Sequence, residues 1–398
     1  MKQERLASVD AIRTLRRAQV AASRDAALAG APFALVHSDE AEEIFALMGI
    51  DVQVYNPWNF IIVSEGKAPH FNQVLNDHGY PGQHFFAFGY ASTLAPEQAP
   101  WGGLPKPAIV IGSTREDLEL RVTELWAREY GCEYFPLDFN FASAAKKYPG
   151  ANWWLNIREN WPDMVDSDRL ELRVSQLKEL IKRLEKLSGK TFDESALAAL
   201  LERINVQMDA WGEVCDLIGS APDCPVSFRD QLACYQMMWS RGTEESLRSI
   251  EAYRDEVKAR VENAVGAYGP VKKRIFYASM ESDPRFHEHL RVQHSSAIVG
   301  GPYTTCPDLY ARTIYGDSLK TLAARNLLLF AIYDTDWWIA QAQRLRADIM
   351  IAIEPPNKYP SMLELACNRA GIPFLSLPSS AASDKNLSKI DTFFNALD

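Results

Sequence analysis

The sequence predicts an α/β fold with two doubly wound, flavodoxin- or Rossmann-like parallel-sheet lobes and a helical domain between them. Short apolar runs alternate with helical patterns early in the chain and again after Gly269-Pro270, which is typical of parallel strands joined by crossover helices. The stretch between keeps apolar residues at helical spacing. A chain of 398 residues also suits two or three domains. We therefore expect an N-terminal α/β lobe at 1–165, a helical segment at 166–269 and a C-terminal α/β lobe at 270–398.

The N-terminal lobe is expected to open with a helix rich in Ala and Arg at 4–29. Asp39 with Glu42, and Ser113 with Glu116, have the spacing of capping boxes, so each pair predicts the start of a helix. The strands of this lobe are expected at Phe33 to Val36, 51–55, 108–111 and 134–139, and the two capped helices are expected to end near Gly49 and Tyr130.

The middle of the chain is expected to be helical. Apolar residues recur at helical spacing from Leu170 to Leu187, and Ser188-Gly189 ends this helix. A second helix is expected to start after Asp193 and to run toward Leu217, with further helices at 226–239 and 243–265.

The C-terminal lobe resumes the alternation of strands and helices. A helix from Ser361 is expected to stop at Gly371, because glycine readily adopts the left-handed conformation that commonly ends a helix. Strands are expected at 274–278, 297–299, 349–353 and 373–377, and helices at about 317–332 and 335–346.

The composition argues against some classes of protein. The net charge of −10, without a local basic patch, argues against nucleic-acid binding. No apolar run approaches the ~20 residues that a bilayer-spanning helix needs. The N-terminal 24 residues are charged and lack the apolar stretch of a secretory signal, so we expect a cytoplasmic protein.

The six cysteines follow no known metal-binding spacing, and no two of them form C-x-x-C. We expect reduced and mostly buried thiols, which is usual for a long cytosolic chain. A metal site assembled from distant cysteines stays open as the alternative.

Polar residues follow several of the predicted strands. Ligands of open α/β sheets bind beyond the carboxyl ends of the strands, near helix N-termini. Three such loops are His37-Ser38-Asp39, Gly112-Ser113-Thr114-Arg115 and Glu354 to Lys358. Simple helix capping is the alternative interpretation for Ser38 and, more strongly, for Ser113. The pair Pro355-Pro356 stiffens the third loop, which favours a functional role there.

Two further groups of residues carry weaker signals. His287, His289 and His294 lie close together on a probable helix, and solvated side chains are a better interpretation than metal ligands. Aromatic residues crowd the segment after the first strands, where an apolar acyl pocket and ordinary packing are equally good interpretations. They are Tyr55, Trp58, Phe60, Phe85, Phe86 and Phe88.

Four stretches, in order along the chain, carry a family resemblance. The first runs from Val36-His37-Ser38-Asp39-Glu40-Ala41-Glu42-Glu43-Ile44 to Gly49, and the second from Leu187-Ser188-Gly189-Lys190-Thr191-Phe192-Asp193-Glu194 to Asn205. The third is Gly316-Asp317-Ser318-Leu319-Lys320-Thr321-Leu322-Ala323, and the last runs from Arg346-Ala347-Asp348-Ile349 to Leu375. Together they resemble the 2-hydroxyacyl-CoA dehydratase family, whose relatives include the paired, D-component-like subunits of ATP-dependent benzoyl-CoA reductase.

This resemblance implies a heterodimer, or a higher oligomer, of two homologous subunits that act on an acyl-CoA substrate. In the family, cysteines from three strand-end loops commonly hold a [4Fe–4S] cluster, and an ATP-hydrolysing activator supplies the electrons. The corresponding loops here are 84–89, 112–116 and 353–358, and none contains a cysteine. Thiolates are the ligands that hold such clusters. We therefore expect that this chain binds no cofactor and that a partner subunit holds any [4Fe–4S] cluster.

Two functions from different classes follow. In the first, the chain is an enzyme subunit of an acyl-CoA dehydratase (a lyase) or an aryl-CoA reductase (an oxidoreductase) of anaerobic aromatic metabolism, or it supports another, non-radical acyl-CoA reaction. In the second, it is a non-catalytic partner that stabilises the complex or docks the activator. For the first function, Ser38 and Glu354 are the candidate catalytic residues, and no residue is assigned to a metal. The candidate substrate-binding residues are His37, Ser113, Thr114, Arg115, Phe86, Asn357 and Lys358.

Overall fold

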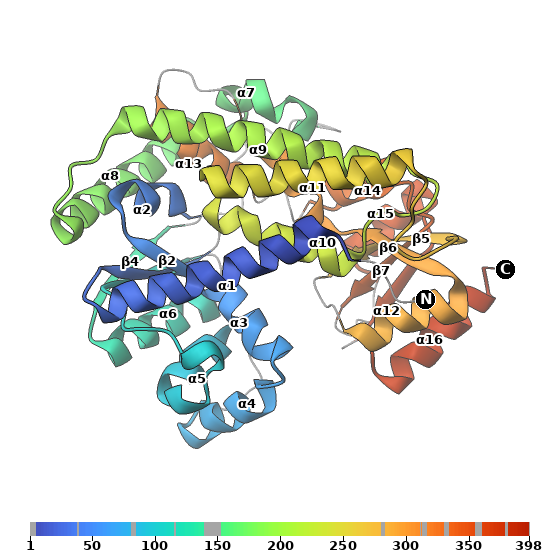
Figure 1. Ribbon diagram of the computed structural model, residues 1–398, viewed down its shortest axis with the longest axis horizontal. Helices are drawn as coiled ribbons and strands as arrows, with labels where there is room; N and C mark the ends of the chain where they lie inside the picture. The colour runs from blue at the N-terminus through green and yellow to red at the C-terminus, as the bar shows by residue number, and fades with distance from the viewer. Residues whose placement is uncertain are drawn as a thin grey trace.

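The computed structural model contains two four-stranded parallel sheets with helices around and between them, which confirms the predicted fold class (Figure 1). The structure describes residues 5–37, 40–80, 85–114, 117–138, 153–279, 283–310, 312, 317–329, 334–354, 360–378 and 381–397. In this part of the chain, no helix combines the length and the apolar character that crossing a bilayer requires.

The first sheet has the strand order β2-β1-β3-β4. Its strands are β1 (Phe33–Val36), β2 (Asp51–Val54), β3 (Ile109–Ser113) and β4 (Glu133–Leu137). The chain leaves β1 toward one side to form β2 and then crosses back to form β3 on the other side. The carboxyl ends of β1 and β3 therefore lie next to each other at the point where the winding direction reverses, which is where α/β sheets bind ligands.

The second sheet repeats this order as β6-β5-β7-β8. Its strands are β5 (Lys273–Ala278), β6 (Ser296–Gly300), β7 (Ile349–Ile353) and β8 (Phe374–Leu377). Its reversal point lies between the carboxyl ends of β5 and β7. Strands β1, β3 and β6 are buried along their whole length, which explains why their sequences are mostly apolar.

Helices of the first lobe cover both faces of the first sheet. Ala34 and Val36 face one core cluster, whereas Phe33 and Leu35 face another, because successive strand residues point to opposite faces. The helices are α1 (Ala7–Leu28), α2 (Glu42–Met48), α3 (Tyr55–Ser64), α4 (Ala68–Asp77), α5 (Phe88–Leu94) and α6 (Asp117–Tyr130), with a short 3-10 turn η1 (Phe85–Ala87).

Several sequence expectations for this lobe are wrong in detail. Helix α2 begins at Glu42 with Ala41 at its N-cap position, whereas Asp39, the predicted cap, lies outside the described residues. Ser113 is the last residue of β3 and lies four residues before α6, so it does not cap that helix. The segment that carries the aromatic cluster forms helices rather than loops, and Tyr55, Trp58 and Phe88 are buried in the core.

The helices predicted within 166–269 are present near their predicted positions, and two short helical elements precede them. Asp166, Asp193 and Thr243 each accept hydrogen bonds from backbone N–H groups at the starts of α8, α9 and α11, and Gly189 ends α8 in the left-handed conformation. The elements are η5 (Trp153–Asn156), α7 (Ile157–Met164), α8 (Ser167–Ser188), α9 (Glu194–Ser220), α10 (Phe228–Tyr235), η6 (Gln236–Ser240) and α11 (Glu244–Glu262).

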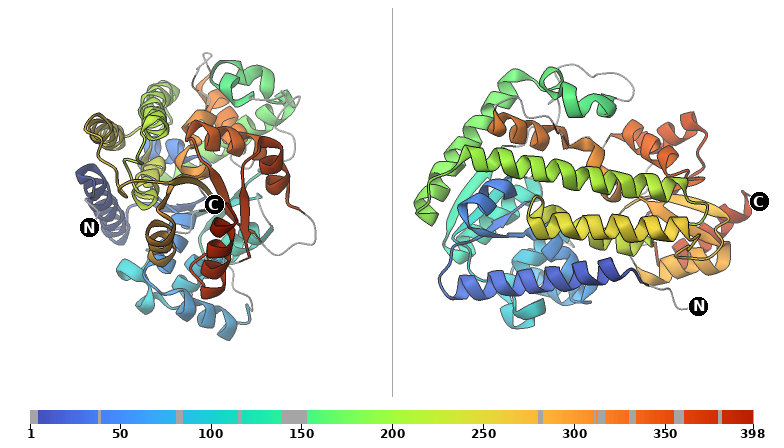
Figure 2. Two further views of the ribbon diagram at one scale, coloured as in Figure 1. Left: turned by 90° about the vertical axis from the view of Figure 1, so that its right-hand side faces the viewer. Right: turned by 45° about the horizontal axis from the view of Figure 1, so that its top comes forward.

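Three long helices, α1, α9 and α11, run side by side across both lobes (Figures 1 and 2). Helix α1 packs on α10 and α11, and Glu256 of α11 accepts hydrogen bonds from the backbone N–H groups of Ala7 and Ser8, both at 2.9 Å. The leading helix is thus joined to the helical segment as well as to the first sheet.

The second lobe completes the fold. Its helices are α12 (Pro284–His294), α13 (Ser318–Leu328), α14 (Thr335–Arg344), α15 (Met362–Ala370) and α16 (Asp384–Asn395), with 3-10 turns η7 (Pro302–Thr304) and η8 (Cys306–Leu309). As predicted, Ser361 caps α15 and Gly371 ends it. The sequence interpretation missed α16.

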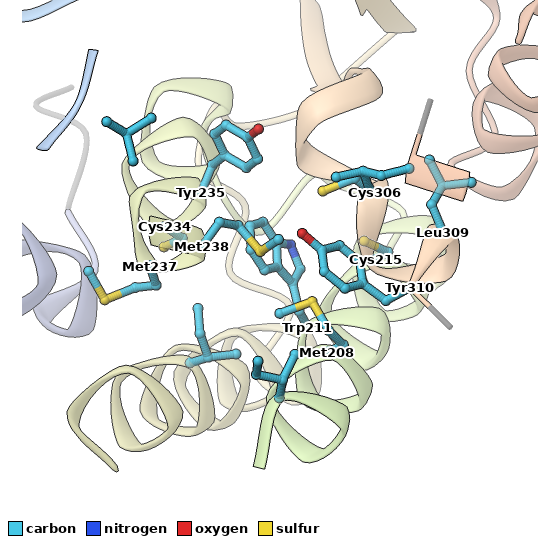
Figure 3. Packing of buried hydrophobic residues seen from close by; sticks show 14 of the residues in the cluster. Met208, Trp211, Cys215, Cys234, Tyr235, Met237, Met238, Cys306, Leu309 and Tyr310 are labelled. Carbon is cyan, nitrogen blue, oxygen red and sulfur yellow. The ribbon is translucent and has the colours of Figure 1, made fainter. Parts of the chain in front are cut away.

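A sulfur-rich core joins the helical segment to the second lobe. Figure 3 shows Met208, Trp211 and Cys215 of α9 packed with side chains of α10 and η6 and with Cys306 of η8. The Trp211 indole N–H donates to the carbonyl oxygen of Thr304 at 3.1 Å, which fixes the segment that follows β6.

Candidate functional site

The carboxyl ends of β1 and β3 bring polar side chains together at the reversal point of the first sheet. His37 directly follows β1, Ser113 ends β3 and Thr114 follows it. Asn56 comes from the first turn of α3, and Glu119 from the first turn of α6. This edge of the sheet is the candidate site of the first lobe.

His37 lies at its centre with its imidazole held from several sides. Its Nε2 atom lies 3.1 Å from Glu119 Oε1 and 3.1 Å from Asn56 Nδ2. The ring also contacts the edge of the Tyr55 ring, with 5.2 Å between centroids. The His37 side chain is only 2% exposed, so these contacts fix its position and orientation within the protein. A carboxylate that accepts a hydrogen bond from an imidazole selects which ring nitrogen carries the proton.

The two polar residues at the end of β3, Ser113 and Thr114, differ in exposure. Ser113 is fully buried, whereas Thr114 is partly exposed and its hydroxyl donates to Asp138 Oδ1 at 2.8 Å. Gly112 precedes them, and a Cβ atom there would lie 2.1 Å from the Tyr134 hydroxyl oxygen. A side chain at 112 would therefore displace the Tyr134 ring beside the site.

Buried ion pairs anchor α2, the helix that follows the His37 loop. Arg173 Nη2 of α8 contacts Glu40 Oε2 at 3.0 Å, and both side chains are almost completely buried. Glu40 Oε1 in turn lies 4.0 Å from His37 Nδ1. Arg241 contacts Glu43 Oε1 at 2.7 Å and Glu42 Oε2 at 3.2 Å. The helical segment thus supplies the cations that hold this acidic stretch in place.

In the second sheet, Glu354 occupies the equivalent strand end. It follows β7 and is partly exposed, and its backbone N–H donates to the Leu377 carbonyl oxygen at 2.8 Å. Burial first, and then the negative charge of Glu354, raise the pKa of the Cys367 thiol to about 12, which places the carboxylate near α15. Glu354 therefore belongs to the second lobe, and His37, Ser113 and Thr114 to the first.

The structure locates part of the predicted site. Phe86 lies in η1, partly exposed, with its backbone oxygen accepting from Asn59 Nδ2 at 3.3 Å. Four of the predicted site residues lie outside the described residues: Ser38, Arg115, Asn357 and Lys358.

Sequence reasoning missed Asn56, Glu119, Glu40 and Arg173. Two of them carried a usable signal. Asn56 interrupts the apolar stretch Tyr55–Ser64, and Glu119 lies in the first turn of the helix that follows a candidate strand end. The partners Glu40 and Arg173 are 133 residues apart, and local spacing cannot pair them.

The cysteines are spread along the chain, and none lies in the segments 84–89, 112–116 and 353–358. All six cysteines are free, and all but Cys132 are buried. Burial raises the pKa of Cys215 to about 12 and that of Cys224 to about 11. The Cys224 thiol donates to the Val226 carbonyl oxygen, and the Cys367 sulfur packs on Met350 Sδ. The five buried cysteines all belong to the core cluster that joins the helical segment to the sheets.

Comparison with known proteins identifies one family. The family model described as 2-hydroxyglutaryl-CoA dehydratase, D-component, matches residues 42–392. No curated protein sequence matches the chain at a significant level. The match covers both sheets apart from β1, together with the helical segment.

Proposed function

Because the chain belongs to the 2-hydroxyglutaryl-CoA dehydratase D-component family, we propose that it is the subunit that helps to bind the acyl-CoA substrate and carries no iron–sulfur cluster. The family makes it a component of a multi-subunit, dehydratase-type enzyme. The substrate, the pairing and the division of labour between subunits are our proposal.

The observation that carries this proposal is the chemistry of the strand ends. The segments 84–89, 112–116 and 353–358 contain no cysteine. The described parts of these segments offer hydroxyl, carboxylate and aromatic groups instead: Thr114, Glu354 and Phe86. Such groups suit hydrogen bonding and apolar contact with an organic substrate, whereas [4Fe–4S] clusters are held by cysteine thiolates.

Exposure divides the described site residues into two roles. Thr114, Glu354 and Phe86 are partly exposed, so we assign them to direct contact with the acyl-CoA. His37 and Ser113 are buried, so we assign them to positioning the loops that carry the contacts. The aromatic surroundings of Phe86, which contacts Phe85 with ring centroids 5.4 Å apart, favour an aromatic acyl group.

The partner in this proposal is a homologous subunit that keeps the three loop cysteines and holds a [4Fe–4S] cluster. An ATP-dependent activator then serves the partner rather than this chain. The complex would catalyse dehydration or ring reduction, with this subunit contributing to the substrate site.

Anaerobic co-purification with a homologous partner subunit tests the proposal. We expect about four irons and four acid-labile sulfides per heterodimer, all retained by the partner after separation of the subunits. Stoichiometric iron on this chain would overturn the proposal. Titration with 2-hydroxyglutaryl-CoA, benzoyl-CoA and free CoA then distinguishes the two acyl classes.

Variants test the placement of the substrate. Thr114→Val and Glu354→Gln should each weaken acyl-CoA binding to the complex at least tenfold without changing the affinity for free CoA. Thr14→Val and Glu262→Gln are matched controls, because both residues are exposed on helices away from the strand ends. Unchanged affinity in both site variants would remove the substrate from this subunit.

A supporting, non-catalytic role is the second candidate. The deep burial of His37 and Ser113, with His37 already held by Glu119 and Asn56, favours it, because these groups serve the fold as they stand. Two results together would support this role. The complex would keep full activity and acyl-CoA affinity when it contains the Thr114 or Glu354 variant, and the remaining subunits would not stay assembled when this chain is omitted.

A further inference from the structure

Two histidines of α12 and one aspartate of α16 direct their side chains at one another in the second lobe. His289 Nε2 and His294 Nε2 each lie 2.7 Å from Asp391 Oδ1. The candidate ligand atoms of the three residues all lie within 4.8 Å of one another. One carboxylate oxygen therefore faces two imidazole nitrogens.

Packing holds this cluster in place. The helices α12 and α16 contact each other, and their residues Phe286, Leu290, Ile390 and Phe394 share one hydrophobic core cluster. The His294 ring stacks on the Phe394 ring with centroids 4.2 Å apart. The side chains of His289 and His294 are 17% and 10% exposed, so the rings are not solvated helix side chains as the sequence suggested.

The cluster is accessible to solvent, and it includes an acidic side chain, which favours binding of a cation. The Asp391 side chain is 43% exposed. Solvent can therefore reach the carboxylate that faces both imidazoles.

We propose that His289, His294 and Asp391 bind a divalent transition-metal ion of the zinc class, which clamps α16 to α12. Two imidazoles and one carboxylate suit Zn²⁺ and its neighbours, whereas Mg²⁺ and Ca²⁺ favour all-oxygen ligands. Three protein ligands leave at least one coordination position for water, in agreement with the exposure of Asp391.

The position of the cluster indicates a structural role. His294 lies two residues before β6 begins, so it is near the amino end of that strand. The candidate substrate site lies at the opposite, carboxyl ends of the strands. An ion here would stabilise the packing of two helices on the second sheet without taking part in the acyl-CoA chemistry.

Zinc titration of the full chain tests the proposal. The protein is stripped with EDTA, dialysed against Zn²⁺ and assayed by elemental analysis, calorimetry and zinc-edge X-ray absorption. We expect one Zn²⁺ per chain, two imidazole scatterers and no sulfur scatterer, together with a Tm raised by several degrees. His294→Gln and Asp391→Asn should weaken binding at least tenfold and abolish the rise in Tm.

His70→Gln is the matched control, because this exposed histidine of α4 lies on the other lobe. It should keep wild-type affinity. Circular dichroism in EDTA establishes that each variant folds, and His289→Gln replaces any variant that does not. Either of two results would overturn the proposal. In the first, the protein binds no zinc and the three side chains form only hydrogen bonds; in the second, zinc binds through sulfur and the cluster variants do not change its binding.

Discussion

Arg241 and Glu43 form a bidentate ion pair inside the protein. Arg241 Nε lies 2.7 Å from Glu43 Oε1, and Nη2 lies 3.1 Å from Oε2, with both side chains at most 2% exposed. Glu43 belongs to α2 beside the first sheet, and Arg241 follows η6 in the helical segment. The pair thus links the acidic stretch after His37 to the helices that span both lobes.

Removing the cation should destabilise the fold strongly. Arg241→Met leaves the carboxylates of Glu42 and Glu43 buried beside an apolar side chain, and breaking a buried pair in this way typically costs about 3–5 kcal/mol. Urea unfolding followed by circular dichroism measures this cost.

A matched control uses an ion pair at the surface. Arg248 contacts Glu244 at 3.4 Å, and both side chains are mostly exposed. Arg248→Met should change the free energy of unfolding by about 0.5 kcal/mol or less. Equal effects of the two substitutions would contradict the importance of the buried pair.

The same pair predicts a pH dependence. Burial raises the pKa of Glu43, but the charge and hydrogen bond of Arg241 outweigh burial, so the pKa lies below the ordinary value of 4.5. A lowered pKa in the folded state adds stability above the unfolded-state pKa, and this stability is lost as the pH falls through the folded-state pKa.

The stability difference between wild type and Glu43→Gln should therefore be full at pH 6 and should shrink as the pH falls below about 4.5, because glutamine does not titrate. Urea midpoints at several pH values measure it. A difference that stays constant down to pH 3 would show that Glu43 does not titrate as its pairing predicts.

Two glycines of α9 should respond in opposite directions to the same substitution. A Cβ at Gly219 would lie 2.3 Å from the Arg344 carbonyl oxygen, whereas at Gly212 the nearest atom is Arg344 Nη2 at 4.0 Å. Gly212→Ala should be neutral or stabilise by up to about 1 kcal/mol, because alanine favours helix. Gly219→Ala should destabilise by about 1–3 kcal/mol through overpacking. Thermal unfolding of both variants measures the contrast, and a stabilising Gly219→Ala would contradict the close approach of α14.

Thiol labelling tests the burial of the cysteines. Cys132 is partly exposed, and the other five cysteines are buried. Native protein should therefore react with one equivalent of a thiol reagent, located at Cys132 by peptide mass spectrometry, and Cys132→Ser should react with almost none. Rapid labelling of Cys215 or Cys367 would indicate that these thiols are accessible, and it would reopen the assembly of a metal site from them.

The helices and strands that were predicted correctly are those whose pattern lies within a few neighbouring residues. The strand Ile349–Ile353 was predicted with the bounds it has, because it is a short apolar run between polar residues. The helices α3 to α5 were missed. Buried residues occur on several sides of α3 and α5 and hide the helical period, whereas Phe71, Val74 and Leu75 of α4 keep helical spacing that the sequence interpretation overlooked. Ser113 matched a capping box in sequence, but the strand continues through it and buries its hydroxyl.

The site was predictable only at its strand ends. His37 and Thr114 follow apolar runs, and the rule for open α/β sheets places such residues together. Which residues they contact could not be predicted, because the partners come from elsewhere in the chain. Glu119 is 82 residues from His37, and only the crossover from β1 to β3 and α6 brings the carboxylate to the imidazole.

The contact between His37 and Glu119 predicts a single tautomer of the buried imidazole. Glu119 Oε1 lies 3.1 Å from Nε2, and an ionised carboxylate can only accept, so Nε2 should carry the proton and donate to it. Imidazole ¹⁵N chemical shifts should report protonated Nε2 in wild type.

Glu119→Gln keeps an accepting oxygen but loses the charge, so it should lower the free energy of unfolding by about 1–2 kcal/mol. Glu119→Leu removes the acceptor from a buried donor and should cost more, about 3 kcal/mol. If His37 positions the substrate loop, Glu119→Gln should also lower kcat of the assembled complex with little change in KM, and restoring the charge with Glu119→Asp should recover part of it. An imidazole protonated only at Nδ1 would contradict this assignment and would leave Asn56 Nδ2 as the donor to Nε2.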